Sequence, residues 1–264
     1  MVAGGLLLVL MAGVALLAPL LHTVDPIEMS PGQRLRPPGA AHWFGTDMYG
    51  RDSYSRVLFG SRISLLVGLV VATITSAIGL GLGVFAGFVR RLDGIVMRVM
   101  DGIMALPDLL LAITFVALTG ASVRNVIIAL VIPQTPRVVR LVRGVVLSLR
   151  EQPFVEASVA LGAGLGRTVL RHVLPNTVAP LIVQGTYVCA SAILIEAALS
   201  FLGAGTPPEI PTWGNMIAQS RLFLSRAPWT IFCPGIALAL VVLAVNLLGD
   251  GLRDRLDPRL ARRM

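Results

Sequence analysis

Six long apolar segments constrain the fold of this chain more than any other feature of its sequence. A helix that crosses the hydrocarbon core of a bilayer, about 30 Å thick, needs roughly 20 apolar residues at a rise of 1.5 Å each. The segments that reach or approach this length cover residues 2–22, 62–88, 99–119, 123–143, 177–200 and 230–249. The sequence therefore predicts an all-α integral membrane protein with six transmembrane helices.

The composition agrees with lipid as the main solvent of the chain. Hydrophobic residues make up 55% of the 264 residues and charged residues only 14%, against about 45–50% and about 25% in soluble domains. The net charge is +8, and every basic residue is an arginine. In a membrane chain this balance indicates cytoplasmic loops that face anionic lipid, and no nucleic acid partner is expected. Cys189 and Cys233 lie in separate apolar runs, which predicts neither a metal site nor a disulfide framework.

The distribution of arginines predicts the orientation of the chain. Segment 2–22 has no preceding basic region and no small-residue cleavage pattern, so we interpret it as a retained first helix. Fourteen arginines lie on the side that holds residues 89–98, the 144–176 insert with the span end before it, and the C-terminal tail; eight lie on the other side. The positive-inside rule places the first side in the cytoplasm. Both termini are then cytoplasmic in a multi-pass plasma-membrane protein, and residues 23–61 and 201–229 lie outside.

The 144–176 insert has the pattern of two short helices joined by a glycine-rich turn. Pro153 suits a first helical turn, residues 154–161 can form a short helix, and Gly162 begins a run of glycines that can close it. A second short helix is predicted at 168–173. Such an element either acts as a lever, gripped by a cytoplasmic partner, or merely links and caps the bundle.

The same insert resembles a known motif. Glu156-Ala157-Ser158, Gly162 six residues after the glutamate, and Leu174-Pro175 resemble the EAA motif of ABC importer permeases, with Ser158 in place of the usual second alanine. Further resemblance to the "C"-type dipeptide, oligopeptide and nickel permeases lies in residues 44–56, 101–108, 196–216 and 246–259. The resemblance covers about residues 42 to 260. Residues 131–137 depart from it, because they lack the expected aromatic side chains.

This resemblance implies the type I ABC importer permease fold. It divides the chain into a first transmembrane helix with an external loop (1–61), a permease domain (62–250) and a cytoplasmic tail (251–264). It also implies contact with an ATPase through the insert, by Phe154, Glu156, Ala157, Ser158, Leu161 and Gly162.

The resemblance further implies a division of labour among subunits. The sequence has no GxxxxGK[ST] stretch to hold phosphates, so this chain is not expected to be an enzyme or to bind a cofactor. ATP and magnesium would be used by one or two separate ABC ATPase subunits or a fused pair. A second homologous permease would complete the path, and an external binding protein would deliver a di- or oligopeptide. The alternative cargoes are nickel, haem or another small solute.

Ionisable residues inside the predicted spans are candidates for function. Asp101 and Asp108 are seven residues apart and share a helix face. Asp108 either satisfies backbone groups freed by Pro107 or lines a polar path. Glu196 is either a functional group or a hydrogen-bond partner of a neighbouring helix.

Arginines three residues apart occupy the end of the fourth predicted span, at positions 137, 140 and 143. Arg137, Arg140 and Arg143 either snorkel to the cytoplasmic interface or form a basic stripe that faces a pore or a partner.

In the external region, Asp47, Arg51 and Asp52 are predicted to form a structural ion-pair knot.

Two other classes of protein fit the apolar spans. An ion-coupled secondary transporter would need ionisable groups facing one another in mid-membrane, and such proteins usually show related broken helices in two halves; the sequence offers little of either. A membrane scaffold that transports nothing would tolerate Gly162→Arg without loss of uptake.

Overall fold

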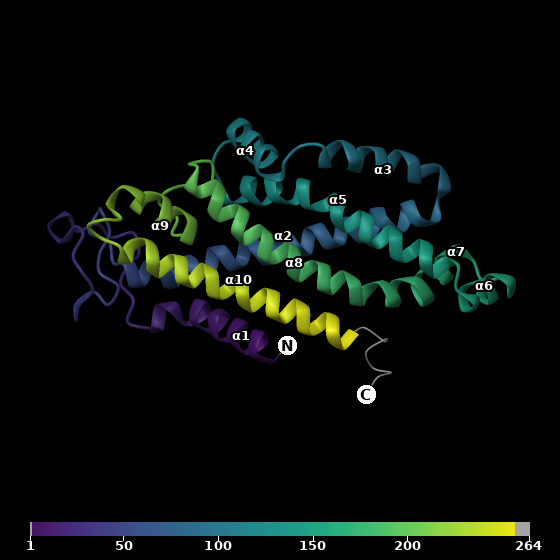
Figure 1. Ribbon diagram of the computed structural model, residues 1–264, viewed down its shortest axis with the longest axis horizontal. Coiled ribbons are helices and arrows are strands. Elements are labelled where there is room, and N and C mark those ends of the chain that lie inside the picture. The colour runs from purple at the N-terminus through teal and green to yellow at the C-terminus, as the bar shows by residue number, and fades with distance from the viewer. Residues whose placement is uncertain (1, 257–264) are drawn as a thin grey trace.

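The computed structural model describes residues 2–256 as a bundle of helices joined by loops (Figure 1). Part of the predicted tail, residues 257–264, lies outside the described residues. The helices are α1 (Val2–Leu17), α2 (Ser53–Phe88), α3 (Arg90–Met104), α4 (Asp108–Thr119), α5 (Val123–Arg150), α6 (Pro153–Ala160), α7 (Leu165–Thr168), α8 (Leu174–Phe201), α9 (Trp213–Ser220) and α10 (Trp229–Leu256). A π-helical turn, Val169–Val173, joins α7 to α8.

Five helical stretches are long and apolar enough to cross a membrane, namely Val2–Leu20, α2, α5, Leu165–Phe201 and α10. They lie where five of the six predicted spans lie. The helix α2 begins at Ser53, well before the predicted residue 62, because the Asp52 side chain accepts a hydrogen bond from the Ser55 N–H and caps the helix.

The third predicted span differs from expectation. Residues 99–119 were expected to form one helix after a polar loop at 89–98, whereas α3 already begins at Arg90 and is bent from α4 by 85°. Pro107 is the physical reason. Proline cannot continue a helical hydrogen-bond ladder, and it disfavours the helical conformation in the residue before it. The pair α3–α4 is therefore a broken span.

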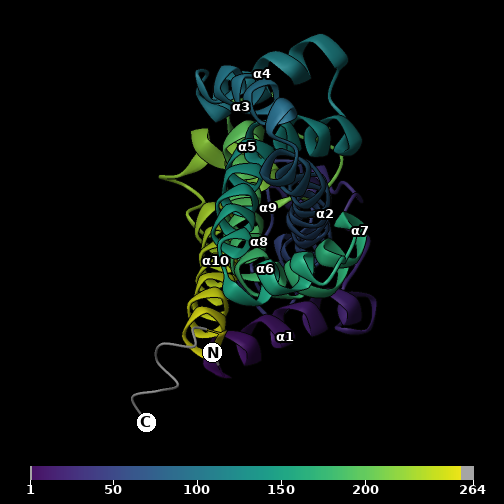
Figure 2. The ribbon, with the colours of Figure 1, turned by 90° about the vertical axis from the view of Figure 1, so that its right-hand side faces the viewer.

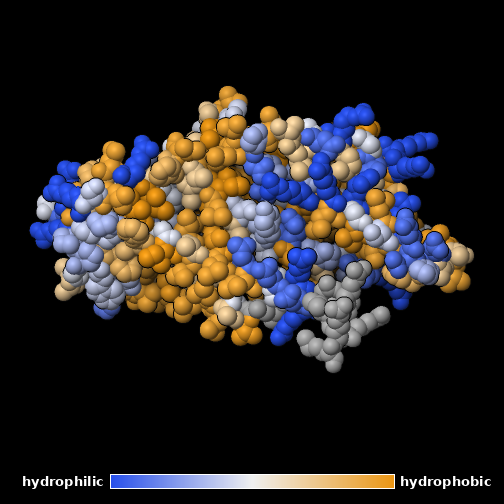
Figure 3. Space-filling model, viewed as in Figure 1, coloured by the Kyte–Doolittle hydropathy of each residue, from blue (hydrophilic) through white to orange (hydrophobic). Residues whose placement is uncertain are grey.

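The helices are arranged as a central group with two flanks. The helices α2, α5, α8 and α10 run along the long axis, whereas α1 and the α3–α4 pair lie on opposite flanks (Figures 1 and 2). The short helices α6 and α7 lie at one end of the bundle and α9 lies at the other (Figure 1). An apolar band separates the polar end near α9 from more polar surfaces towards α6 (Figure 3).

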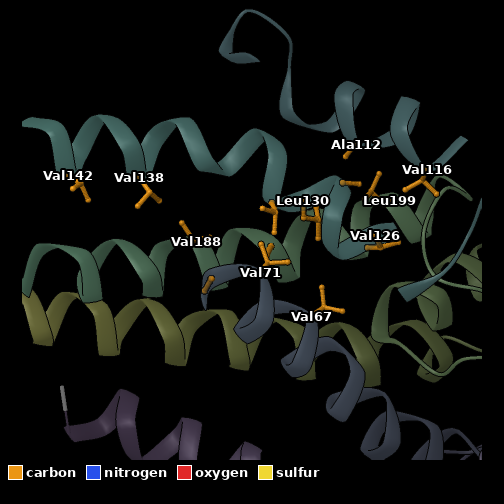
Figure 4. Close-up of a cluster of buried hydrophobic side chains, with 14 of the residues drawn as sticks. Val67, Val71, Ala112, Val116, Val126, Leu130, Val138, Val142, Val188 and Leu199 are labelled. Carbon is orange, nitrogen blue, oxygen red and sulfur yellow. The ribbon is translucent and has the colours of Figure 1, made fainter. Parts of the chain in front are cut away.

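Glycines of α2 bring α5 into close contact. A Cβ atom at Gly79, Gly83 or Gly87 would lie 2.4–2.6 Å from a side-chain atom of Val138, Val142 or Val146, respectively. Both sets repeat every four residues, so they form matching stripes along the two helices. The valines continue into a core cluster with side chains of α2, α4, α5 and α8 (Figure 4). This contact fixes the rotation of α5 about its axis.

We predict that Gly83→Leu destabilises the protein, because the new side chain would collide with Val142 and with the Val139 carbonyl, 3.0 Å from its Cβ. Overpacking of this kind costs about 1–3 kcal/mol. Thermal unfolding in detergent should show a lower melting temperature. Gly81→Leu is the matched control on the same helix, because its Cβ meets no atom within 4 Å. Equal melting temperatures for the two variants would contradict the proposed stripe contact.

Candidate functional site

The segment between α5 and α8 leaves the bundle as an elbow, formed by residues 151–173. At its start, an Arg150 Nη atom donates a hydrogen bond of 2.6 Å to the Gly87 carbonyl, and the guanidinium lies 5.5 Å from the centre of the Phe88 ring. This arginine therefore ties the end of α5 to the end of α2. Beyond it, α6 and α7 lie at the end of the bundle (Figure 1).

Local sequence explains why α6 starts and stops where it does. Pro153 occupies the first turn, where its fixed φ suits a helix and its missing N–H costs no hydrogen bond. Gly162 has a φ of +85°, which favours glycine. The Ala163 N–H then donates to the Ser158 carbonyl over 3.1 Å, which closes the last turn. The predicted helix–glycine turn–helix arrangement is present in the structure.

The tip of the elbow exposes apolar side chains. Leu161 is 90% exposed, Val159 57% and Phe154 46%, whereas Val155 on the same helix is buried. Exposed apolar surface of this kind is typical of sites that contact another protein or a membrane. Such a contact would bury Leu161, which none of residues 2–256 covers.

Of the residues predicted to couple to an ATPase, Phe154, Glu156, Ala157 and Ser158 lie on α6, and Leu161 and Gly162 directly follow it. Glu156 is in its first turn, where the helix dipole favours an acidic side chain. Glu156 and Ala157 are exposed, and Ser158 is partly buried. A groove of about 530 Å³ lies beside them, lined by Phe88, Arg150, Val155, Glu156, Val159, Ala160, Ala163, Leu165 and Thr168. The groove joins the elbow to the ends of α2 and α5.

A second polar feature joins α5 to the broken span. Arg137 pairs with Asp108 at 2.8 Å, and Arg140 pairs with Asp101 at 2.5 Å. Arg143 pairs with Asp93. We call these three pairs the ion-pair ladder. It combines the two aspartates and the arginines whose roles the sequence left open, and it shows that these arginines have acidic partners within the chain.

The third rung of the ladder, Arg143 with Asp93, was missed by the sequence analysis. Two guanidinium nitrogens contact the carboxylate, one of them at 2.7 Å. Asp93 had been assigned to a polar loop, but α3 begins before it. Asp93 and Asp101 are eight residues apart on one side of α3, and this spacing is the signal that the sequence offers. The expectation that Asp101 and Asp108 share one helix face is wrong, because Pro107 interrupts the helix and Asp108 begins α4, which is bent from α3 by 85°.

Glu196 is buried in α8 and faces the loop that follows the helix. One carboxylate oxygen accepts a hydrogen bond of 2.9 Å from the Ser200 hydroxyl, and the other has no partner among the described residues. Asn215 closes the neighbouring loop, because its side chain donates to the Thr206 and Pro207 carbonyls. The hydrogen-bond partner of the Glu196 carboxylate, Ser200, thus lies one turn further along the same helix.

The residues predicted to form an external ion-pair knot lie in a buried polar cluster, the polar knot, at the end of the bundle opposite the elbow. Asp47 and Arg51 pair at 2.6 Å, and Arg51 also donates to the Gln219 side chain of α9 over 2.6 Å. Asp52 caps α2 and contacts His42 at 2.9 Å. The sequence did not indicate His42 or Gln219, because both contacts depend on how distant loops fold together.

Comparison with known proteins gives a consistent result. Residues 79–262 match the family described as "Binding-protein-dependent transport system inner membrane component". The chain is 56% identical over 249 residues to the "Probable peptide ABC transporter permease protein y4tQ" of Sinorhizobium fredii, covering 94% of this chain and 85% of that protein. It is 46% identical over 248 residues to the dipeptide transport system permease protein DppC of Alkalihalophilus pseudofirmus, covering 94% and 82%.

Among solved structures, a chain of the MetNI methionine ABC transporter in an inward-facing conformation is similar in fold. The TM-score is 0.64 at 20% identity, and the match covers 76% of this chain and 96% of that chain. This similarity and the helical architecture confirm the predicted all-α permease fold. Because the family match spans more than half of the chain, the protein belongs to the family of inner-membrane components of binding-protein-dependent transport systems.

Proposed function

We propose that this chain is one of two permease subunits of an ABC importer for di- or oligopeptides. The observation that carries the proposal is the exposed apolar elbow between two membrane-spanning helices, with Leu161 at 90% exposure. In this proposal ATP is hydrolysed on separate subunits, and this chain converts their movement into the opening and closing of a path.

The elbow is built to transmit movement. The helix α6 is followed within a few residues by α7 and α8 and preceded closely by α5, so a force on its tip acts on both long helices. The Arg150 bond to Gly87 extends the connection to α2. Packed helices move as rigid bodies rather than deforming continuously, which supports a lever rather than a passive linker.

The names of the relatives support peptide as cargo. Proteins named as peptide or dipeptide permeases share 46–56% identity with nearly the whole chain, and a glutathione transport system permease from Pectobacterium atrosepticum is 40% identical over 261 residues. Glutathione is itself a small peptide. The relatives thus favour peptide over nickel or haem.

A permease subunit of this kind requires further protein subunits. A second homologous permease would complete the path, and one or two ABC ATPase subunits or a fused pair would receive α6 at the cytoplasmic face. An external binding protein would dock on the 201–229 region, where α9 is held firmly to the polar knot by Arg51 and Gln219. The arginine distribution supports this orientation and cytoplasmic termini.

We predict that the elbow is reached only from the cytoplasm. In a background with Cys189 and Cys233 replaced by alanine, Gly164→Cys should react with a membrane-impermeant maleimide only after the cytoplasmic face is opened. Glu209→Cys, in the opposite loop, should react in intact spheroplasts. Both positions are exposed in the structure. Labelling of Gly164→Cys from outside would overturn the orientation.

We predict that Leu161→Asp abolishes co-purification of the ATPase subunits and peptide uptake. A carboxylate at this position would be left in a desolvated contact, which costs several kcal/mol unless it is paired. The isolated chain should keep its melting temperature, because Leu161 contacts water there. Leu222→Asp is the control for co-purification alone, since Leu222 is 83% exposed at the other end of the bundle, away from the elbow. Normal co-purification of the Leu161 variant would refute the docking role.

We predict that Gly162→Arg stops uptake while membrane insertion stays normal. A residue with a side chain is strained at a φ of +85°, and the arginine would also enter the partner contact. Gly164→Arg separates the two effects, because Gly164 has an ordinary φ of −66° and open space around its Cβ. Uptake by the Gly164 variant should exceed that of the Gly162 variant. Unchanged uptake in the Gly162 variant would support the scaffold alternative.

A further inference from the structure

We propose that the ion-pair ladder lines the solute path on this chain and that it accommodates small zwitterions, such as peptides with free ends. This inference rests on the proposed function, because the path needs a second permease to enclose it. Its members are Asp93–Arg143, Asp101–Arg140 and Asp108–Arg137.

The ion-pair ladder lies within the thickness of the membrane, at a level that a transported solute has to cross. The helix α5 begins at Val123 at the outer end, so at 1.5 Å per residue Arg137 lies about 21 Å along its axis and Arg143 about 30 Å. A bilayer core is about 30 Å thick. The three rungs therefore cover the inner third of the membrane, down to its cytoplasmic edge. A solute leaving the path must pass this level.

The ladder is also exposed to whatever covers this face. The side chains of the Asp101–Arg140 pair are 60% and 43% exposed, and those of the Asp108–Arg137 pair 24% and 35%. Hydrophilic side chains gather over α3 on the surface of the molecule (Figure 3). Charged side chains within a membrane face a protein interior or a water-filled cavity, and not lipid tails. The face that carries the ladder is therefore directed away from hydrocarbon.

The ladder is a poor device for simply holding α3 against α5. Exposed ion pairs contribute little to stability, and buried pairs are often no better than apolar side chains of the same size. Elsewhere in this chain, close helix contact comes from glycines and valines, as between Gly83 and Val142. Three charged pairs at one helix contact thus call for a role other than adhesion.

The charge pattern fits a neutral solute that carries both signs. Each carboxylate has its own guanidinium, so the surface is electrically satisfied when the path is empty. Adjacent rungs are three residues apart on α5, about 4.5 Å along the axis. The ammonium and carboxylate of a dipeptide are roughly 7 Å apart in an extended chain, so its ends reach different rungs. A path must bind its solute weakly enough to release it, and paired charges offer such weak contacts.

The test uses the assembled transporter in proteoliposomes, with Cys189 and Cys233 replaced by alanine. Ala105→Cys places a thiol in the exposed turn between Asp101 and Asp108, and it leaves every rung intact. Ala239→Cys is the matched control, because Ala239 is also exposed but lies on the apolar part of α10. A cationic and an anionic methanethiosulfonate serve as water-borne probes, first without nucleotide and then with trapped ATP.

We expect both probes to modify Ala105→Cys at least about tenfold faster than Ala239→Cys, as a water-filled face requires. When each rate is divided by the rate of the same probe with a small thiol in solution, the two probes should differ by less than about threefold, because a paired surface has no net charge. A saturating transported dipeptide with its binding protein should slow the reaction. The rate should also differ between the two nucleotide conditions.

Three results would overturn the proposal. Equal rates at Ala105→Cys and Ala239→Cys under every condition would show that the ladder is sealed. A strong preference for one probe would exclude a surface for zwitterions. Lack of protection by the dipeptide would place the ladder in a crevice away from the path. Labelling without nucleotide does not depend on the elbow, so failure here is distinguishable from failure of the Leu161 test.

A paired substitution tests the charges themselves. Asp101→Asn together with Arg140→Gln keeps polar side chains at the same rung but removes both charges. We expect dipeptide uptake to fall about tenfold, corresponding to about 1.4 kcal/mol, while the amount of assembled transporter is unchanged. Unchanged uptake would show that this rung does not contact the solute.

Discussion

The close contact between α2 and α5 is the interaction on which the rest of the structure depends. Gly79, Gly83 and Gly87 leave no room between the helices, so α5 can sit in only one rotation. That rotation turns its valines inward, towards α2. It also turns Arg137 and the following arginines towards the broken span. A single packing contact therefore determines where the charges of α5 lie.

The two ends of the bundle are held together in different ways. At the end that holds α9, polar side chains from distant loops contact one another: Arg51 donates to Gln219 of α9, and the Trp229 indole donates to the Thr46 carbonyl over 3.3 Å. At the elbow end, α6 and α7 have few such ties and expose apolar side chains instead. The end with α9 is thus held by polar contacts between distant segments, whereas the elbow has few such contacts and exposes apolar surface.

The parts of the fold that local sequence determines could be predicted. Apolar runs of sufficient length mark the spans whatever surrounds them, and Pro153 with Gly162 marks the ends of α6. Pro107 itself is a local signal for the bend, but the apolar residues on both sides of it led to the prediction of one continuous span. By contrast, the rung formed by Asp93 and the link from Arg51 to Gln219 join residues 50 and 168 positions apart. Such contacts depend on the packing of whole helices, which no short window of sequence contains.

The hydrogen bond between α5 and α2 uses a side chain from one helix and the main chain from the other. Its acceptor is the main-chain carbonyl of Gly87, which no amino acid substitution removes, whereas its donor is the single side chain of Arg150. Position 87 is nevertheless restricted, because a Cβ there would lie 2.5 Å from Val146. Substitution at position 87 is thus limited by the room for a side chain beside Val146, and substitution at position 150 by the need for a hydrogen-bond donor. Two neighbouring sites of one contact therefore accept different kinds of change during evolution.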